Sequence, residues 1–251
     1  MIETVNITFK KKSIHFLWQH ILLLISLYFM TLGIAFCVRS HLGSSVISSL
    51  PMSFSIAGTE GKVPGLTIGG YTNIMNILLV IGQIIVLRRH FQPIQLLQLV
   101  IGYLFGILID LNMSITSIFT YDTIYQQIFA QLIGCVILAF GIAMEVRCGS
   151  VTMPGEGIQV AVSHVSGLPF AKVKIIINCL LVVLAILSCY IFWGTWLWNI
   201  IGPGTLFAMI FVGWMVKFIG HHMSWYNRIL GYSPGFRRYI YGLARFLNLK
   251  D

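Results

Sequence analysis

Six separate runs of about 20 apolar residues follow one another along this chain of 251 residues. A helix of that length matches the hydrocarbon core of a bilayer, which is about 30 Å thick, because each residue adds about 1.5 Å. Only 9% of the residues are charged, which is too few to cover a soluble domain. The sequence therefore predicts an all-α membrane protein with six transmembrane helices. The predicted spans are residues 16–38, 67–88, 94–115, 123–146, 172–193 and 200–220.

The basic residues predict the orientation of these spans. With the N-terminus in the cytoplasm, every lysine and arginine except Arg39 and Lys62 lies on the cytoplasmic side. An excess of positive charge is typical of cytoplasmic loops. We therefore expect a multi-pass protein of a bacterial inner membrane with both termini in the cytoplasm. The net charge of +9 favours contact with anionic lipid over nucleic acid, because the basic residues lie between apolar runs.

The two halves of the chain resemble each other. Residues 32–39 at the end of the first span are similar to residues 140–147 at the end of the fourth, and Asn76 is matched by Asn178. Each half contains three spans, an odd number, so the second half must be inserted upside down relative to the first. We expect two inverted three-helix repeats. The predicted divisions are a cytoplasmic N-terminal segment (1–15), the repeats (16–118 and 119–220) and a cytoplasmic, basic, amphipathic tail (221–251).

Each half also contains a shorter apolar segment after its first span. These segments cover residues 44–57 and 151–165, and glycine and proline interrupt both. A helix of about 14 residues reaches only about 21 Å, which is less than the thickness of the core. We predict that both are broken, re-entrant segments, one entering from each side. If both crossed fully, there would be eight spans and parallel repeats, and Arg88 and Arg89 would lie outside, against the charge bias.

Four motifs resemble those of the YczE/YyaS/YitT family of bacterial membrane proteins. They are Leu42-Gly43-Ser44-Ser45, Gly65-Leu66-Thr67-Ile68-Gly69, Met153-Pro154-Gly155-Glu156-Gly157 and residues 201–208. The resemblance runs from about residue 20 to residue 220. In that family an acidic residue follows a proline in the short segments, and Glu156 fits this place, whereas residues 46–48 of the first half lack both. The resemblance implies an inner-membrane protein that moves small molecules or supports secretion.

Glu156 is the first candidate for a ligand-binding residue, since it lies in a Pro-Gly-Glu-Gly sequence of the second broken segment. A carboxylate at membrane depth is costly unless it meets water or a partner, so it points to a function. The flanking glycines let a ligand approach the backbone, and the N-terminus of a half-helix attracts an anionic group. The alternative is an ordinary glutamate in a cytoplasmic loop.

Two arginines and four smaller polar residues complete the candidate site. Arg39 and Arg147 end the first and fourth spans, where they can bind an anionic group bidentately or extend to lipid headgroups. The matched asparagines either line a ligand site or join helices. The remaining members of the predicted set are Asn76, Asn178, Ser44 and Ser48.

These features predict a small-molecule secondary transporter or channel-like permease. Its site would lie between the two broken segments and take an anionic or zwitterionic substrate. The alternative is a membrane protein that binds or steadies a partner in secretion or biosynthesis. We expect no enzyme, because no nucleophile triad, Walker or metalloprotease pattern is visible. We expect no metal or cofactor, because the five cysteines are scattered in apolar runs, and we leave a homodimer open.

Overall fold

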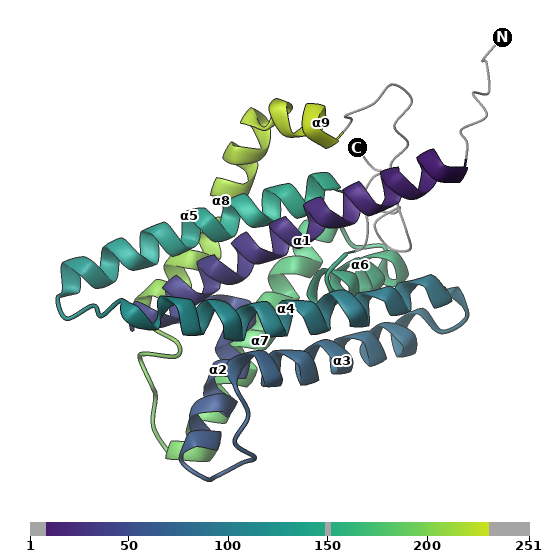
Figure 1. Ribbon diagram of the computed structural model, residues 1–251. Coiled ribbons are helices and arrows are strands. Elements are labelled where there is room, and N and C mark those ends of the chain that lie inside the picture. Colours follow the sequence, from purple (N-terminus) through teal and green to yellow (C-terminus); the bar gives the residue numbers. More distant parts are fainter. Residues whose placement is uncertain (1–8, 149–151, 231–251) are drawn as a thin grey trace.

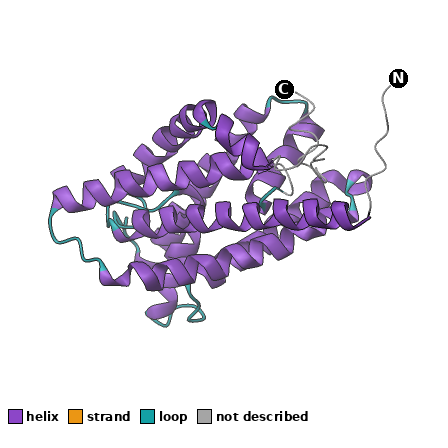
Figure 2. Cartoon of the chain, turned by 45° about the horizontal axis from the view of Figure 1, so that its top comes forward, coloured by secondary structure: helices purple, strands orange, loops and turns teal. Residues whose placement is uncertain are grey.

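The computed structural model describes residues 9–148 and 152–230, which form a bundle of helices without a strand (Figure 1, Figure 2). Six helices in these ranges are long and apolar enough to cross a membrane. They are α1 (Phe9–Arg39), α3 (Ile68–Leu87), α4 (Leu97–Ile115), α5 (Ile124–Cys148), α7 (Phe170–Trp193) and α8 (Pro203–His222). The short 3-10 helices η1 (Arg88–His90), η2 (Pro93–Leu96) and η3 (Thr116–Ile118) extend α3 and α4. The prediction of six spans is confirmed, and their ends agree to within a few residues.

Two shorter helices follow α1 and α5, as expected for the broken segments. They are α2 (Val46–Thr59) with 14 residues and α6 (Pro154–Ser166) with 13 residues. Pro154 occupies the first turn of α6, where its fixed φ suits a helix start, and Gly167 ends the helix at a φ of 70°. Gly43, before α2, has a φ of 116°, which favours glycine. Each helix is about 20 Å long and therefore too short to cross the bilayer alone.

The central contact of the bundle joins α1 to α5, which lie side by side along most of their length (Figure 1). Glycines allow the two backbones to approach closely. A Cβ atom added to Gly33 would lie 2.4 Å from the backbone nitrogen of Leu138, and one added to Gly134 would lie 2.8 Å from the carbonyl oxygen of Gly33. Small residues at such crossings are typical of membrane helices, where close packing drives association.

The other helices pack around this central pair in matching ways. α1 contacts α4 as α5 contacts α8, and α2 packs on α7 as α3 packs on α6. One match is missing, since α3 and α4 pack closely whereas α7 and α8 make few contacts. The Asn76 amide donates to the carbonyl of Gly102 across the α3–α4 contact. Gly213 of α8, by contrast, has no atom within 4 Å of an added Cβ. One face of α8 is therefore left uncovered by its own half.

The last described helix, α9 (Ser224–Leu230), is the beginning of the predicted tail and packs on α1 and α5. Met223, Tyr226 and Leu230 are buried in the main core, and the Trp18 indole donates to the carbonyl of Ile229 at 3.0 Å. The rest of the tail, residues 231–251, lies outside the described residues, as do residues 1–8 and 149–151. The described part of the tail thus lies against the helices rather than apart from them.

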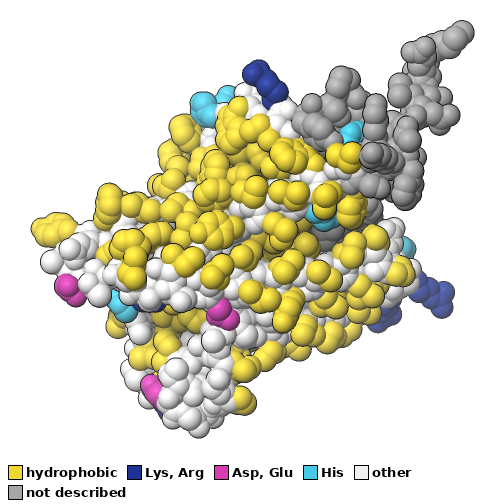
Figure 3. Space-filling view, in the orientation of Figure 1, with side chains coloured by type: hydrophobic (Ala, Val, Ile, Leu, Met, Phe, Trp, Pro, Cys, Tyr) yellow, Lys and Arg dark blue, Asp and Glu magenta, His cyan; other side chains and the backbone are white. Residues whose placement is uncertain are grey.

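Apolar side chains cover most of the face seen in Figure 3, as is expected of helices that face lipid.

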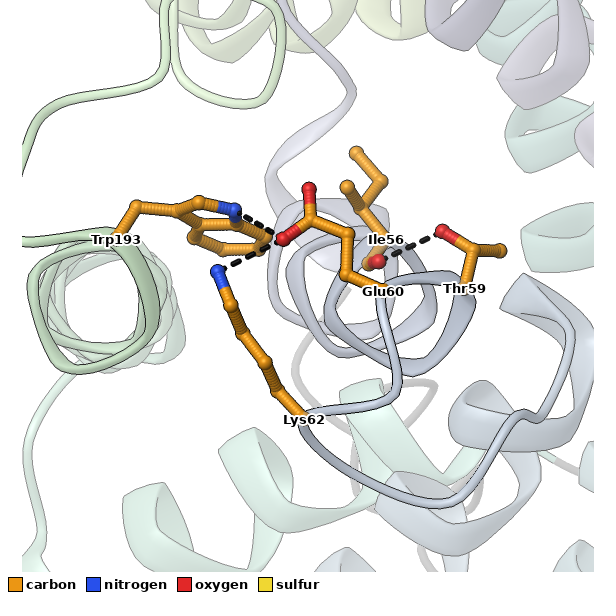
Figure 4. A network of polar contacts seen from close by, with 5 residues as sticks. All are labelled: Ile56, Thr59, Glu60, Lys62 and Trp193. Carbon is orange, nitrogen blue, oxygen red and sulfur yellow. Dashed lines mark hydrogen bonds and ion pairs between the residues drawn. The ribbon is translucent and has the colours of Figure 1, made fainter.

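A polar cluster joins the end of α2 to the end of α7 (Figure 4). Glu60 Oε2 lies 2.7 Å from Lys62 Nζ and accepts a hydrogen bond of 2.8 Å from the Trp193 indole. The bond to Lys62, followed by that from Trp193, lowers the pKa of the exposed Glu60 carboxyl. These contacts fix one end of the short helix α2.

Candidate functional site

Glu145 of α5 is a carboxylate buried beside the start of α6. Only 4% of this residue is exposed. Its Oε1 accepts the backbone N–H of Met153 at 3.2 Å, whereas Oε2 has no hydrogen-bond partner among the described residues. Burying a carboxylate costs several kcal/mol unless donors or a counter-charge compensate it. Oε2 therefore marks a position where a donor or a positive group would be strongly stabilised.

Two glutamines from other helices bring further oxygen atoms to the same turn of α6. Gln83 of α3 donates its amide to the carbonyl of Pro154 at 3.1 Å. Because that carbonyl can only accept, the Gln83 amide is held in one orientation and its Oε1 is left unpaired. Gln98 of α4 has an unpaired Oε1 as well. The two oxygens lie 2.9 and 2.5 Å from where a Cβ on Gly157 would be, so only glycine leaves room for both.

Two more unpaired oxygens lie on α6 or just before it. Gln159 donates to Asn178 Oδ1 at 3.4 Å, and neither its own Oε1 nor Thr152 Oγ1 has a partner among the described residues. Native proteins leave few buried polar atoms unpaired, and such an atom usually meets water, an ion or a ligand. Most of the unpaired side-chain atoms among the described residues belong to this group. We define the α6 site as Gln83, Gln98, Glu145, Thr152 and Gln159.

Glu156 lies in the first turn of α6 and is paired. Its Oε1 is 3.6 Å from Lys174 Nζ on α7, and its side chain is 14% exposed. An acidic residue is also stabilised there by the helix dipole. Glu145 and Glu156 therefore bring two carboxyl groups to the start of α6. Lys174 pairs with Glu156, whereas Glu145 forms no ion pair among the described residues.

The two predicted arginines lie at matching places, each at the end of a helix in its own half. Arg39 donates to Thr116 Oγ1 at 3.0 Å and to the carbonyl of Met113 at 2.6 Å, at the end of α4. Arg147 donates to the carbonyl of Gly220, at the end of α8. Cations are favourable at helix C-termini, where carbonyl groups lack partners. Neither arginine forms an ion pair with Glu156.

The remaining predicted residues are divided between the two short helices. Asn178 reaches the α6 site through Gln159, whereas Asn76 joins α3 to α4. Ser44 donates to the carbonyl of Ile200 at 3.1 Å, and the Ser48 hydroxyl lies 2.7 Å from that of Ser45, at the start of α2. The structure therefore places Glu156 and Asn178 together at α6 and the two serines at α2.

A family model matches residues 17–221 of the chain, and its description is a family of unknown function, DUF6198. The chain belongs to this family. A search of the curated proteins and a search of the solved structures each give no match. Every residue of the α6 site of this DUF6198 protein lies inside the matched range.

Gln83, Gln98 and Glu145 of this DUF6198 protein were not predicted as site residues from the sequence. A signal was present, because Gln83, Gln98 and Glu145 all lie within apolar runs, where polar residues are rare. The sequence alone does not show that residues from α3, α4 and α5 meet at one turn of α6.

Proposed function

We propose that this DUF6198 protein is a small-molecule secondary transporter or channel-like permease. The observation that carries this proposal is the group of buried, unpaired oxygens around the start of a short helix in a six-span bundle. Transporters commonly bind substrates where a discontinuous helix exposes its terminus inside the protein. A helix that only packed against its neighbours would not need several unpaired acceptors beside it.

We further propose that the two halves are inverted repeats. The matching partners of the helices support this proposal, because exchanging the halves turns the α1–α4 contact into the α5–α8 contact and the α2–α7 contact into the α3–α6 contact. The likeness between residues 32–39 and 140–147 supports it independently. The relation to the YczE/YyaS/YitT family stays a prediction.

The chemistry of the α6 site favours a zwitterionic substrate over a purely anionic one. The unpaired amide and carboxylate atoms are acceptors, so they suit an ammonium or another donor. In the first turn of α6 the N–H groups of Glu156 and Gly157 already donate to the carbonyl of Met153, so the N–H of Gly155 is the one without a partner among the described residues, and it suits a carboxylate. An added Cβ on Gly155 would meet no atom of the described residues within 4 Å. Arg39 and Arg147 already bind helix ends and supply no positive charge here.

Ligand-dependent thermal stabilisation of the purified protein tests this function. We expect small amino acids to raise the midpoint of unfolding, whereas the same molecules without the amine should not, because Glu145 requires a positive group. A ligand whose concentration is a hundred times its Kd raises the free energy of unfolding by about 2.7 kcal/mol. Compounds that stabilise would then be tested for uptake into proteoliposomes. Equal effects of the amine-free acids would contradict the zwitterion assignment, and stabilisation without uptake would favour the alternative, a protein that binds or steadies a partner.

We propose a bacterial inner membrane as the location, with both termini in the cytoplasm, from the charge bias of the loops. Single cysteines would test it in a variant whose native cysteines are replaced by alanine. We expect Lys62→Cys and Asp122→Cys in intact cells to react with an impermeant thiol reagent. Arg89→Cys and Lys172→Cys should react only after the cells are opened. Labelling of Arg89→Cys in intact cells would replace the inverted six-span arrangement with the eight-span one.

A further inference from the structure

A pocket of about 500 Å³ opens where the end of α5 meets the last turns of α8. It is separate from the α6 site, since the two share no lining residue. The pocket combines basic side chains with aromatic rings. Its lining residues are Arg147, Trp214, Lys217, Phe218, Gly220, His221 and His222. In Figure 3 histidine and basic side chains stand out at the top of the molecule, over α8 and α9.

The basic side chains of this pocket form no ion pair with any described residue. The ion pairs of the described residues join Lys62 to Glu60 and Lys174 to Glu156, and neither involves the pocket. Arg147 contacts only a carbonyl oxygen there, that of Gly220, while Lys217 is exposed. Two cations side by side repel each other, so an anion between them would be stabilised. A guanidinium and an ammonium are the groups that most often bind phosphate.

The aromatic wall indicates that the ligand also has an apolar part. The rings of Trp214 and Phe218 stack with their centroids 5.7 Å apart, and both side chains are exposed. Phe218 lies near the end of α8, and Trp214 lies one turn further into the predicted span. In the first half α3 covers α4, whereas α8 has little contact with α7, so lipid has access to this face of α8. A free phosphate ion has no apolar part that would contact these rings.

We propose that this pocket binds the headgroup of an anionic phospholipid. Arg147 and Lys217 hold the phosphate, and the acyl chains follow Trp214 and Phe218 along α8. The histidines at the rim, His221 and His222, add donors near the headgroup. This lipid site does not depend on the transport proposal.

The number of lipids retained by the full-length protein in native mass spectrometry tests this site. Phosphatidylglycerol should be retained and should raise the midpoint of unfolding, whereas phosphatidylcholine should do neither. Lys217→Gln should weaken phosphatidylglycerol binding about fivefold, the usual effect of one basic residue at an anionic membrane surface. Lys217→Arg should preserve binding. The control is Lys62→Gln, which removes a lysine outside the pocket, beyond the end of α2, and should leave the retention of phosphatidylglycerol unchanged.

Two further comparisons separate a lipid from a free anion. Trp214→Ala should weaken retention of phosphatidylglycerol, and inorganic phosphate at millimolar concentration should neither stabilise the protein nor displace the lipid. Unchanged retention in Lys217→Gln would overturn the pocket as the binding site. Stabilisation by inorganic phosphate that equals the effect of phosphatidylglycerol and is unaffected by Trp214→Ala would overturn the lipid assignment.

Discussion

Replacing Gly33 by alanine is expected to destabilise the protein strongly, whereas the same replacement at Gly213 should leave it at least as stable. At Gly33 the new Cβ would lie 2.4 Å from the backbone of Leu138 on α5. Backbone cannot move aside as a flexible side chain can, so α1 and α5 must separate. Overpacking of this kind costs about 1–3 kcal/mol or more. At Gly213 the Cβ meets nothing, and alanine favours the helix by up to about 1 kcal/mol.

Thermal unfolding of the detergent-solubilised variants, followed by circular dichroism, measures this difference. The two proteins carry the same substitution in long apolar helices, so propensity and added volume are matched. Gly134→Ala should resemble Gly33→Ala, because its Cβ would lie 2.8 Å from the carbonyl of Gly33. If Gly33→Ala and Gly213→Ala unfold at the same temperature, the close contact between α1 and α5 is wrong.

Replacing Glu145 by glutamine is expected to abolish binding of the zwitterionic ligand while the protein still folds. The amide keeps the size of the carboxylate and can still accept the N–H of Met153, but it no longer offers a negative charge to an ammonium. Loss of a buried charged partner usually costs about 2–5 kcal/mol, which corresponds to about 30-fold or more in affinity. Without ligand, Glu145→Gln should unfold no earlier than the wild type, because the amide keeps the hydrogen bond from Met153 and replaces a buried carboxyl group whose second oxygen has no partner among the described residues.

Glu156→Gln is the matched control, since it makes the same change on a carboxylate that is already paired. Lys174 binds Glu156 and offsets its charge, so this variant should lose less affinity than Glu145→Gln. The measurement is the ligand-dependent shift in unfolding temperature for both variants. If Glu156→Gln loses more affinity than Glu145→Gln, then Glu156, which the sequence first indicated, is the main ligand-binding residue.

The spans and the short helices follow from the sequence because lipid imposes simple requirements. No water is present in the bilayer core to pair backbone groups, so an apolar run of sufficient length must be a helix, and a shorter run cannot cross. Pro154 and Gly167 mark the ends of α6 by their own backbone preferences. Glu156 was found for a similarly local reason, since a carboxylate in an apolar segment is unusual wherever the helix lies.

The partners of the polar residues were decided only by the tertiary structure. Arg147 and Glu145 are two residues apart on α5, yet the first contacts the end of α8 and the second the start of α6. Gln83 and Gln98 come from different helices and meet at Gly157, where the absence of a side chain lets both approach. Apolar periodicity determines that a helix forms and roughly which side is buried, but not which neighbour it meets. That choice depends on close packing between helices, as at Gly33 and Gly134, which involves atoms far apart in the chain.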